Sequence, residues 1–280
     1  MKKHLYYLPK LGESWGLILI FIVLSLICSF PTEPLKKSVG DIALAILNIL
    51  TYALLFLYIS LRSQNILKQY SAAGLEPPYP KQRRTFNILI ALVLIPATIC
   101  LSLSIEPLYS WWQTPEWFTK IMEEMVSNMD FFASFLMVAV CAPLFEELLC
   151  RGVILRGLLQ YMAPWKAIVW SAFIFAVMHM NPWQGIPAFL IGLALGWVYY
   201  RTRNIWYCVL IHFVNNFTSL MMVRLYPETK EIDSLRKLFT LNEYIIVYIA
   251  AVAIVVLSIV YIHKITKNND SKTEAISPEV

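Results

Sequence analysis

The sequence lacks the cysteine and histidine patterns that mark disulfide-bonded domains and the common zinc modules. Its five cysteines lie far apart, with no CxxC pair, and each falls inside an apolar segment: Cys28, Cys100, Cys141, Cys150 and Cys208. No HExxH helix occurs, which excludes the zinc-protease motif that a single helix carries. We therefore interpret the cysteines as small buried hydrophobic residues.

Charged residues are also scarce. They make up 15% of the chain while apolar residues make up 59%, against roughly 45–50% apolar in soluble domains. The mean hydropathy is +0.62. Apolar runs of about 20 residues, long enough to cross ~30 Å of hydrocarbon, recur along the sequence. This composition argues against an ordinary soluble domain and predicts an all-α, polytopic transmembrane helical bundle.

The first apolar stretch lacks the small-residue cleavage site of a signal peptide. It follows Lys2, Lys3 and Lys10, as the apolar part of a signal peptide would, but further apolar segments come after it. We therefore expect a membrane anchor that is retained.

The apolar segments predict eight spans. They cover residues 15–31, 40–62, 86–105, 131–160, 165–181, 186–201, 205–223 and 244–263. We divide the chain at these segments into four regions. Residues 1–130 hold the first spans and an acidic loop, residues 131–223 hold most of the ionisable residues found inside spans, residues 224–263 hold a second loop and the last span, and residues 264–280 are expected to be a disordered cytoplasmic tail.

Basic residues indicate how the spans are oriented. With eight spans, the lysine-bearing ends of the chain lie on one side with loop 63–85, the hairpin near 161–166 and loop 201–204. The acidic loop 106–130 and the mixed loop 224–243 lie on the other side. Because cytoplasmic loops are enriched in Lys and Arg, we expect a multi-pass protein of the inner or plasma membrane with both termini in the cytoplasm. The net charge of +5 reflects this bias, so we expect lipid and no nucleic acid as a partner.

A few polar side chains interrupt the apolar segments. They lie on the fourth, fifth and seventh predicted spans: Glu146, Glu147, Arg151, His179, His212, Asn215 and Asn216. Ionisable residues inside spans are by default candidates for a functional site. Glu147 and Arg151 are four residues apart, share a helix face and can pair. Glu146 is rotated ~100° from Glu147, which leaves it as the spare carboxylate.

Spacing also predicts the depth of these residues. Pro143 removes the backbone hydrogen bond to Ala139, so it can kink the helix and admit water beside Glu146. If the fourth and fifth spans turn near Ala163, Glu146 and His179 lie at the same height, ~24–26 Å from the turn. His212 follows Asn204 closely in the seventh span, so we expect a submerged site nearer the cytoplasmic face. The spacing of Gly192 and Gly196 suggests close helix packing.

Each polar residue also has a plainer interpretation. A single membrane histidine is more often packed than catalytic, and a Glu–Arg pair is more often structural. Their coincidence favours one shared site, because each group would cost ~2 kcal/mol or more if left unsatisfied in lipid.

Three short motifs resemble those of the CPBP intramembrane proteases. The segments EELLCR (146–151), FAVMH (175–179) and HFVNN (212–216) fit EExxxR, FxxxH and HxxxN in that order. The family includes type II CAAX prenyl endopeptidases, bacterial lysostaphin-resistance-like proteins and Abi proteins linked to bacteriocin self-immunity. The resemblance covers about residues 130–223, and Cys150 stands where the family more often has an aromatic residue.

The resemblance implies an intramembrane endopeptidase whose protease core is region 131–223. It would hydrolyse a peptide bond of a membrane-associated protein or peptide, prenylated CAAX-type substrates among them. Glu146 would be the main catalytic carboxylate and would activate water. Glu147 would support Glu146 and hold Arg151.

The histidines and the amide complete the implied site. His179 would help to position the attacking water, and His212 and Asn216 would steady the oxyanion. Glu146, His179 and His212 could instead be three zinc ligands, with water at a fourth position. The sequence leaves zinc or no cofactor open, and we favour the metal-free reaction.

Two other functions fit the same residues. A proton-coupled carrier also uses buried Glu, Arg and His, but it predicts an inverted repeat, whereas the ionisable cluster here lies only in the second half of the chain. A non-enzymatic bacteriocin self-immunity protein would keep the cluster for stability alone. The sequence leaves the oligomeric state open.

Overall fold

The computed structural model describes most of the chain. The described residues are 6–29, 32–75, 86–123, 129–226 and 235–274. Within these ranges every regular element is a helix and no strand occurs, which confirms the predicted all-α membrane bundle.

The helices follow the predicted apolar segments closely. In chain order they are α1 (Leu11–Ser29), α2 (Thr32–Ala72), α3 (Ile88–Ile105), α4 (Glu116–Glu123), α5 (Phe131–Ser134), α6 (Ala142–Glu147), α7 (Arg156–Leu158), α8 (Pro164–Met178), α9 (Pro182–Thr202), α10 (Ile205–Leu225) and α11 (Leu241–Glu274). Two π-helical segments, η3 (Phe135–Cys141) and η4 (Leu148–Leu155), join α5, α6 and α7 into one rod. Short 3₁₀ turns are η1 (Glu106–Leu108) and η6 (Leu235–Leu238).

Five helical segments of the described chain are long and apolar enough to cross a membrane. They are Leu11–Cys28, Ile88–Leu108, Phe131–Leu158, Ile205–Leu225 and Leu241–Lys267. The apolar helix α8 is shorter, with 15 residues. The helices coincide with all eight predicted spans, while the number that cross the bilayer remains a prediction.

Two helices extend beyond their predicted spans. α2 has 41 residues and continues into the basic loop predicted from residue 63. It ends where Gly74 adopts a φ of 67° and the Leu75 amide donates to the Tyr70 carbonyl at 2.9 Å, the bond that closes a helix at a left-handed residue. α11 likewise continues to Glu274, so the tail predicted to be disordered from residue 264 is helical to that point, because no Gly or Pro interrupts the helix. The last residues of that predicted tail, 275–280, lie outside the described residues.

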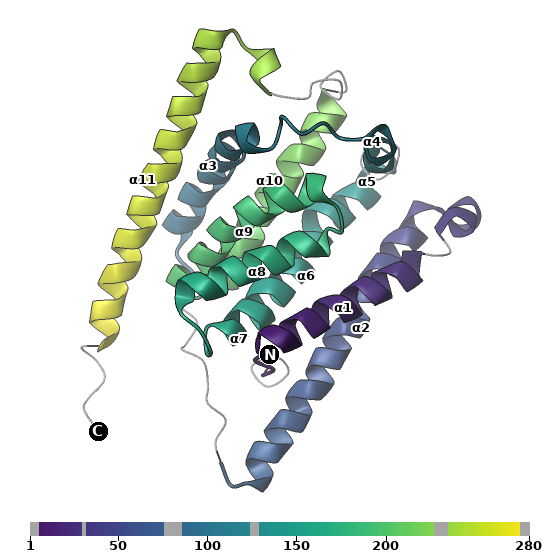
Figure 1. Cartoon of the computed structure of the whole chain (residues 1–280), viewed down its shortest axis with the longest axis vertical. Coiled ribbons are helices and arrows are strands. Elements are labelled where there is room, and N and C mark those ends of the chain that lie inside the picture. The colour runs from purple at the N-terminus through teal and green to yellow at the C-terminus, as the bar shows by residue number, and fades with distance from the viewer. Residues whose placement is uncertain (1–5, 30–31, 76–85, 124–128, 227–234, 275–280) are drawn as a thin grey trace.

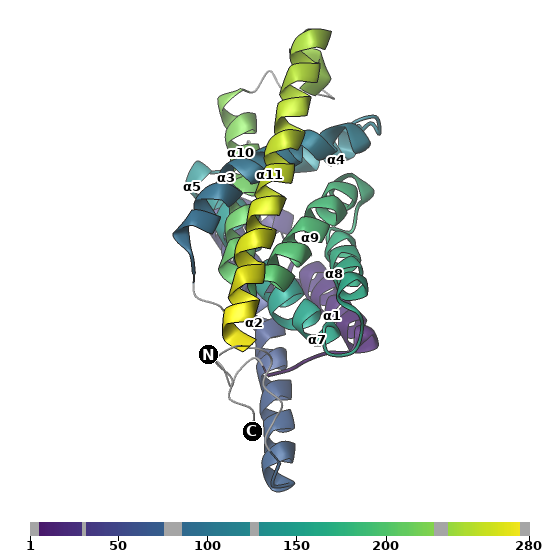
Figure 2. The same ribbon diagram turned by 90° about the vertical axis from the view of Figure 1, so that its left-hand side faces the viewer.

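The helices are arranged around a central group formed by α6 and α8–α10. α1 pairs with α2 and contacts α8, whereas α3 packs against both α10 and α11 (Figures 1 and 2). α8 and α9 form the most extensive pair. A Cβ atom added at Gly192 would lie 3.2 Å from the Ala172 Cβ, and one at Gly196 would lie 3.0 Å from the Ile168 side chain. The predicted close packing at these two glycines is therefore confirmed.

Candidate active site

The predicted site residues gather around one cavity. It has a volume of about 680 Å³ and is lined by residues of α2, α3, α4 and α6 and of α8 to α10. Of the six residues to which the resemblance gives a role, four line it: Glu146, His179, His212 and Asn216. The other two, Glu147 and Arg151, are fully buried. Three helical segments far apart in sequence thus bring a carboxylate, two imidazoles and an amide to one space.

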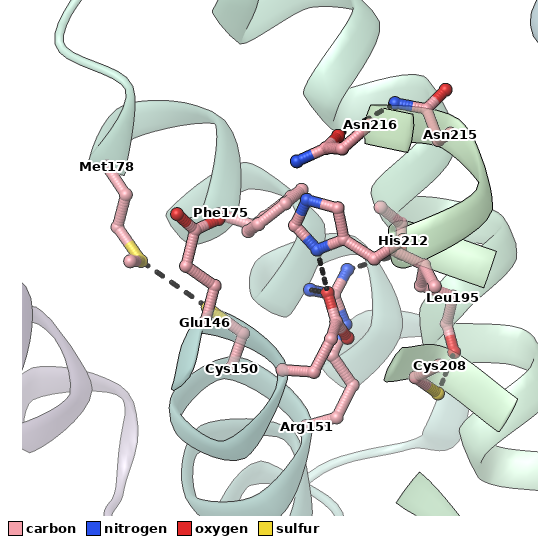
Figure 3. Close-up of polar contacts among 12 residues, drawn as sticks. Glu146, Cys150, Arg151, Phe175, Met178, Leu195, Cys208, His212, Asn215 and Asn216 are labelled. Atoms are coloured by element: carbon pink, nitrogen blue, oxygen red, sulfur yellow. Dashed lines mark hydrogen bonds and ion pairs between the residues drawn. The ribbon is translucent and has the colours of Figure 1, made fainter. Parts of the chain in front are cut away.

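Glu147 is the centre of a buried ionic group. Its Oε1 atom accepts a hydrogen bond from Arg151 Nη1 at 3.0 Å, so the predicted pair is present. The same oxygen lies 3.0 Å from His212 Nδ1 (Figure 3). Arg151 also donates from Nη2 to the Gly192 carbonyl at 3.1 Å, and its guanidinium lies 4.5 Å from the Phe175 ring centre. Both terminal nitrogens of the arginine are thus paired without Glu146, while its Nε atom has no hydrogen-bond partner among the described residues.

The partners of the two histidines select their tautomers. His179 Nδ1 lies 2.9 Å from the Phe175 carbonyl, which can only accept, so Nδ1 carries the proton. His212 Nδ1 faces the Glu147 carboxylate and likewise donates. In each neutral ring Nε2 therefore presents a lone pair. For His212, donation from Nε2 to an oxyanion requires the imidazolium form, a condition that the motif alone did not reveal.

Phe175 holds both imidazoles in place. Its ring makes edge-to-face contacts with His179 and with His212, at centroid distances of 5.1 and 5.5 Å and an interplanar angle of 88° in each case. The phenylalanine of the FxxxH motif is buried, with 2% of its surface exposed, and it forms part of the cavity wall. One buried ring therefore sets the positions of both histidines.

Glu146 keeps one carboxylate oxygen available. Its Oε1 atom accepts a hydrogen bond from the Tyr52 hydroxyl at 3.1 Å. Its Oε2 atom is buried and has no hydrogen-bond partner among the described residues. Each of the two adjacent carboxylates has one oxygen without a hydrogen-bond partner among the described residues. They differ in position, because Glu147 is fully buried beside Arg151 and His212, whereas Glu146 lines the cavity.

A chain of hydrogen bonds fixes the Asn216 amide. Ser102 Oγ donates to Asn215 Oδ1 at 2.9 Å, and Asn215 Nδ2 donates to Asn216 Oδ1 at 3.1 Å. Asn216 Nδ2 then donates to the Val138 carbonyl at 2.9 Å. Because Nδ2 carries two protons, this bond leaves a second proton for a group in the cavity.

The Val138 carbonyl is available because of Pro143. In the π-helical register an amide bonds the carbonyl five residues back, and the Ala142 amide donates to the Met137 carbonyl accordingly. The next bond in this register would join residue 143 to Val138, and proline has no amide proton. The loss of a bond to Ala139, expected for an α-helical register, stays a prediction. Asn216 replaces the missing donor.

A constrained turn ends α8 at His179. The next residue, Met180, adopts a φ of 54°, a left-handed conformation that costs a non-glycine residue roughly 1–2 kcal/mol. Asn181 then caps α9 and donates from Nδ2 to the His179 carbonyl at 2.7 Å. The short turn therefore fixes the backbone on both sides of the histidine.

The cavity continues to the side of the acidic loop. α4 lines it with Thr119, Met122 and Glu123, and the cavity wall also includes Trp183 and Tyr109. Burial, with a smaller contribution from the charge of Glu106, raises the pKa of Tyr109 to about 12, so this hydroxyl remains neutral. The sequence predicted a site nearer the cytoplasmic, basic face and did not predict this extension of the cavity. The extension is visible only in the fold, where α4 lies over the helix ends.

The donor set does not form a zinc site as arranged. Among the described residues, no three His, Cys, Asp or Glu side chains are placed to hold a metal ion. The Nδ1 atoms of both histidines contact a backbone carbonyl or a carboxylate, and metal-binding histidines commonly make such contacts. These supporting contacts would suit a metal, whereas the arrangement of the metal-binding atoms does not.

Tyr52 and Ser102 are site residues that sequence reasoning missed. Tyr52 is one of 15 tyrosines in the chain, and Ser102 lies in an apolar helix that carries no motif. Neither residue has a spacing that relates it to Glu146 or Asn216. Only the packing of α2 and α3 against the other helices reveals them.

Comparison with known proteins agrees with the motifs. Residues 128–218 match the family model of Rce1-like proteins, described as type II CAAX prenyl endopeptidases. This matched stretch, which is similar to that family, is referred to below as the Rce1-like segment. The Rce1-like segment contains all three motifs, which confirms the resemblance to CPBP and CAAX proteases. No curated protein and no solved structure matches the chain. The helix that supplies Tyr52 lies outside the Rce1-like segment.

Proposed function

We propose that the chain is an intramembrane endopeptidase of the CAAX type that hydrolyses a peptide bond with water activated by Glu146. The observation that carries this proposal is the buried, unpartnered Oε2 atom of Glu146 beside a cavity that both histidines also line. The match of this segment to an endopeptidase family supports the same reaction.

Glu146 and His179 prepare the nucleophile. Oε2 of Glu146 takes a proton from water as the water oxygen attacks the peptide carbonyl carbon. The Nε2 lone pair of His179 accepts a hydrogen bond from the second water proton and thereby orients the water. When the carbon–nitrogen bond breaks, Glu146 passes its proton to the leaving amine.

Asn216 and His212 stabilise the negative charge that develops on the carbonyl oxygen. Asn216 donates its second Nδ2 proton, and its orientation is fixed before substrate binds. His212 donates from Nε2 as the imidazolium, whose charge faces the Glu147 carboxylate. Arg151 holds that carboxylate from the other side. Glu147 and Arg151 thus act through His212.

The cavity supports a membrane-associated peptide as the substrate. It is large enough for several residues, and its walls are mostly aliphatic and aromatic. A prenylated C-terminal peptide and a bacterial membrane peptide are the two candidate substrate classes. The charge bias supports a site in the inner or plasma membrane with cytoplasmic termini.

The proposal is tested by comparing the peptides released from membranes that contain the wild type or Glu146→Gln. Peptides that vanish in Glu146→Gln, but persist in the exposed control Glu116→Gln, support the protease. Identical peptides in all three samples contradict it. If Glu146→Gln leaves the phenotype of the cells unchanged, the chain is a scaffold or immunity protein. If Glu146→Gln abolishes uptake of a solute without any change in the released peptides, the chain is a carrier.

A separate experiment decides whether zinc takes part. We expect the purified chain to remain active after exhaustive chelation, with no stoichiometric metal in elemental analysis. Activity that disappears on chelation and returns with zinc would replace the metal-free reaction by one in which Glu146, His179 and His212 bind the ion.

A further inference from the structure

Tyr52 is a polar side chain of α2 that no motif includes. Its hydroxyl lines the cavity and donates to Glu146 Oε1 at 3.1 Å, a contact that joins residues 94 positions apart. The tyrosine lies outside residues 128–218, so the family match says nothing about it.

Aromatic contacts hold Tyr52 in a defined position. Its ring stacks on Phe145, with centroids 5.0 Å apart and planes 15° apart, and it contacts Phe21 of α1 at 5.4 Å. Phe145 immediately precedes Glu146. The stack therefore connects the phenol of α2 to the backbone that carries the carboxylate, so the hydroxyl has a fixed direction.

We propose that Tyr52 is a positioning residue that assigns the two oxygens of Glu146 to different tasks. This inference rests on the proposed function. The hydroxyl occupies Oε1 and prevents free rotation of the carboxylate, which otherwise has broad torsional freedom. Oε2 then remains the oxygen that meets water. The Rce1-like segment consequently needs α2 to complete its site.

The test is Tyr52→Phe, which removes the hydroxyl and keeps the ring stack. The probe is an internally quenched peptide that spans a cleavage site found in the membrane comparison. We expect kcat to fall ~10–100-fold while KM stays within about twofold, because a hydrogen bond to a charged group is lost and the cavity is unchanged. Tyr58→Phe, an exposed tyrosine of the same helix, is the matched control and should leave both constants unchanged.

Three further measurements separate positioning from a purely structural role. The melting temperature of Tyr52→Phe should equal that of the wild type, and Glu146→Gln/Tyr52→Phe should bind the peptide as tightly as Glu146→Gln. The infrared band of the Glu146 carboxylate is assigned by subtracting the spectrum of Glu146→Gln from that of the wild type. When both proteins also carry Tyr52→Phe, this band should appear at a shifted frequency, because the hydrogen bond to Oε1 is lost. A purely structural role predicts weaker binding and a lower melting temperature.

The possible failures of the two proposals are distinct. Full activity in Tyr52→Phe with an unshifted band overturns the positioning role, even if Glu146→Gln is inactive. Full activity in Glu146→Gln overturns the proposed function itself.

Discussion

At the scale of single residues, Glu146 and Glu147 are neighbours in sequence with opposite surroundings. The difference in helix angle was predictable, because Arg151 is four positions after Glu147 and the two carboxylates are adjacent in sequence. The contact between Glu147 and His212 was not predictable, since it depends on how α10 packs against α6. The spacing of residues on one helix gives its faces, whereas partners from other helices come only from the fold.

Removing Arg151 should strongly destabilise the protein. Arg151→Met leaves the fully buried Glu147 carboxylate without its cation, and we expect a loss of about 3–5 kcal/mol in the free energy of unfolding, measured by denaturant titration in detergent. The double variant Glu147→Gln/Arg151→Met should recover most of this loss. Arg62→Met, which breaks a half-exposed ion pair, should cost less than about 1 kcal/mol. A loss in Arg151→Met as small as this control would contradict the account.

At the scale of elements, the fourth predicted span combines α-helical and π-helical segments around Pro143. Its apolar length and the presence of a proline were evident from the sequence, so a kink was predictable. The π register was not, and neither was the hydrogen bond that Asn216 of α10 donates to the Val138 carbonyl. A carbonyl freed in one helix thus orients an amide of another.

Restoring an amide at residue 143 should reduce catalysis without weakening the fold. In Pro143→Ala the new amide competes with Asn216 for the Val138 carbonyl, and we expect kcat to fall about tenfold, in line with one lost hydrogen bond. The melting temperature should not decrease, because alanine favours a helix more than proline does. Pro96→Ala, a change at the proline inside α3, is the control and should leave kcat unchanged. Wild-type kcat in Pro143→Ala would contradict the role assigned to this carbonyl.

At the scale of the whole molecule, hydropathy predicted where the helices occur but not how they enclose the cavity. The apolar segments were sufficient to locate α1 to α3 and α8 to α11. The positions of α2 beside Glu146 and of α4 over the helix ends depend on contacts between distant parts of the chain, which leave no local pattern. For this reason the motif residues were found from the sequence, whereas Tyr52 and the extent of the cavity were not.

The charge bias gives a topology that can be measured in cells. In a background without native cysteines, Thr114→Cys in the acidic loop should react with a membrane-impermeant maleimide in intact cells. Ser71→Cys, near the end of α2, should react only after permeabilisation, because the basic loop is expected in the cytoplasm. The reverse labelling pattern would invert the orientation and place the acidic loop in the cytoplasm.

The central claim is that Glu146 activates water for hydrolysis of a peptide bond inside the membrane. Its most direct test is the cleavage rate of the purified protein in liposomes containing ¹⁸O-water, for the wild type and for Glu146→Gln. We predict that the wild type incorporates ¹⁸O into the new carboxylate and that Glu146→Gln, with an unchanged melting temperature, is at least ~10²-fold slower. Cleavage by Glu146→Gln at the wild-type rate would contradict the account.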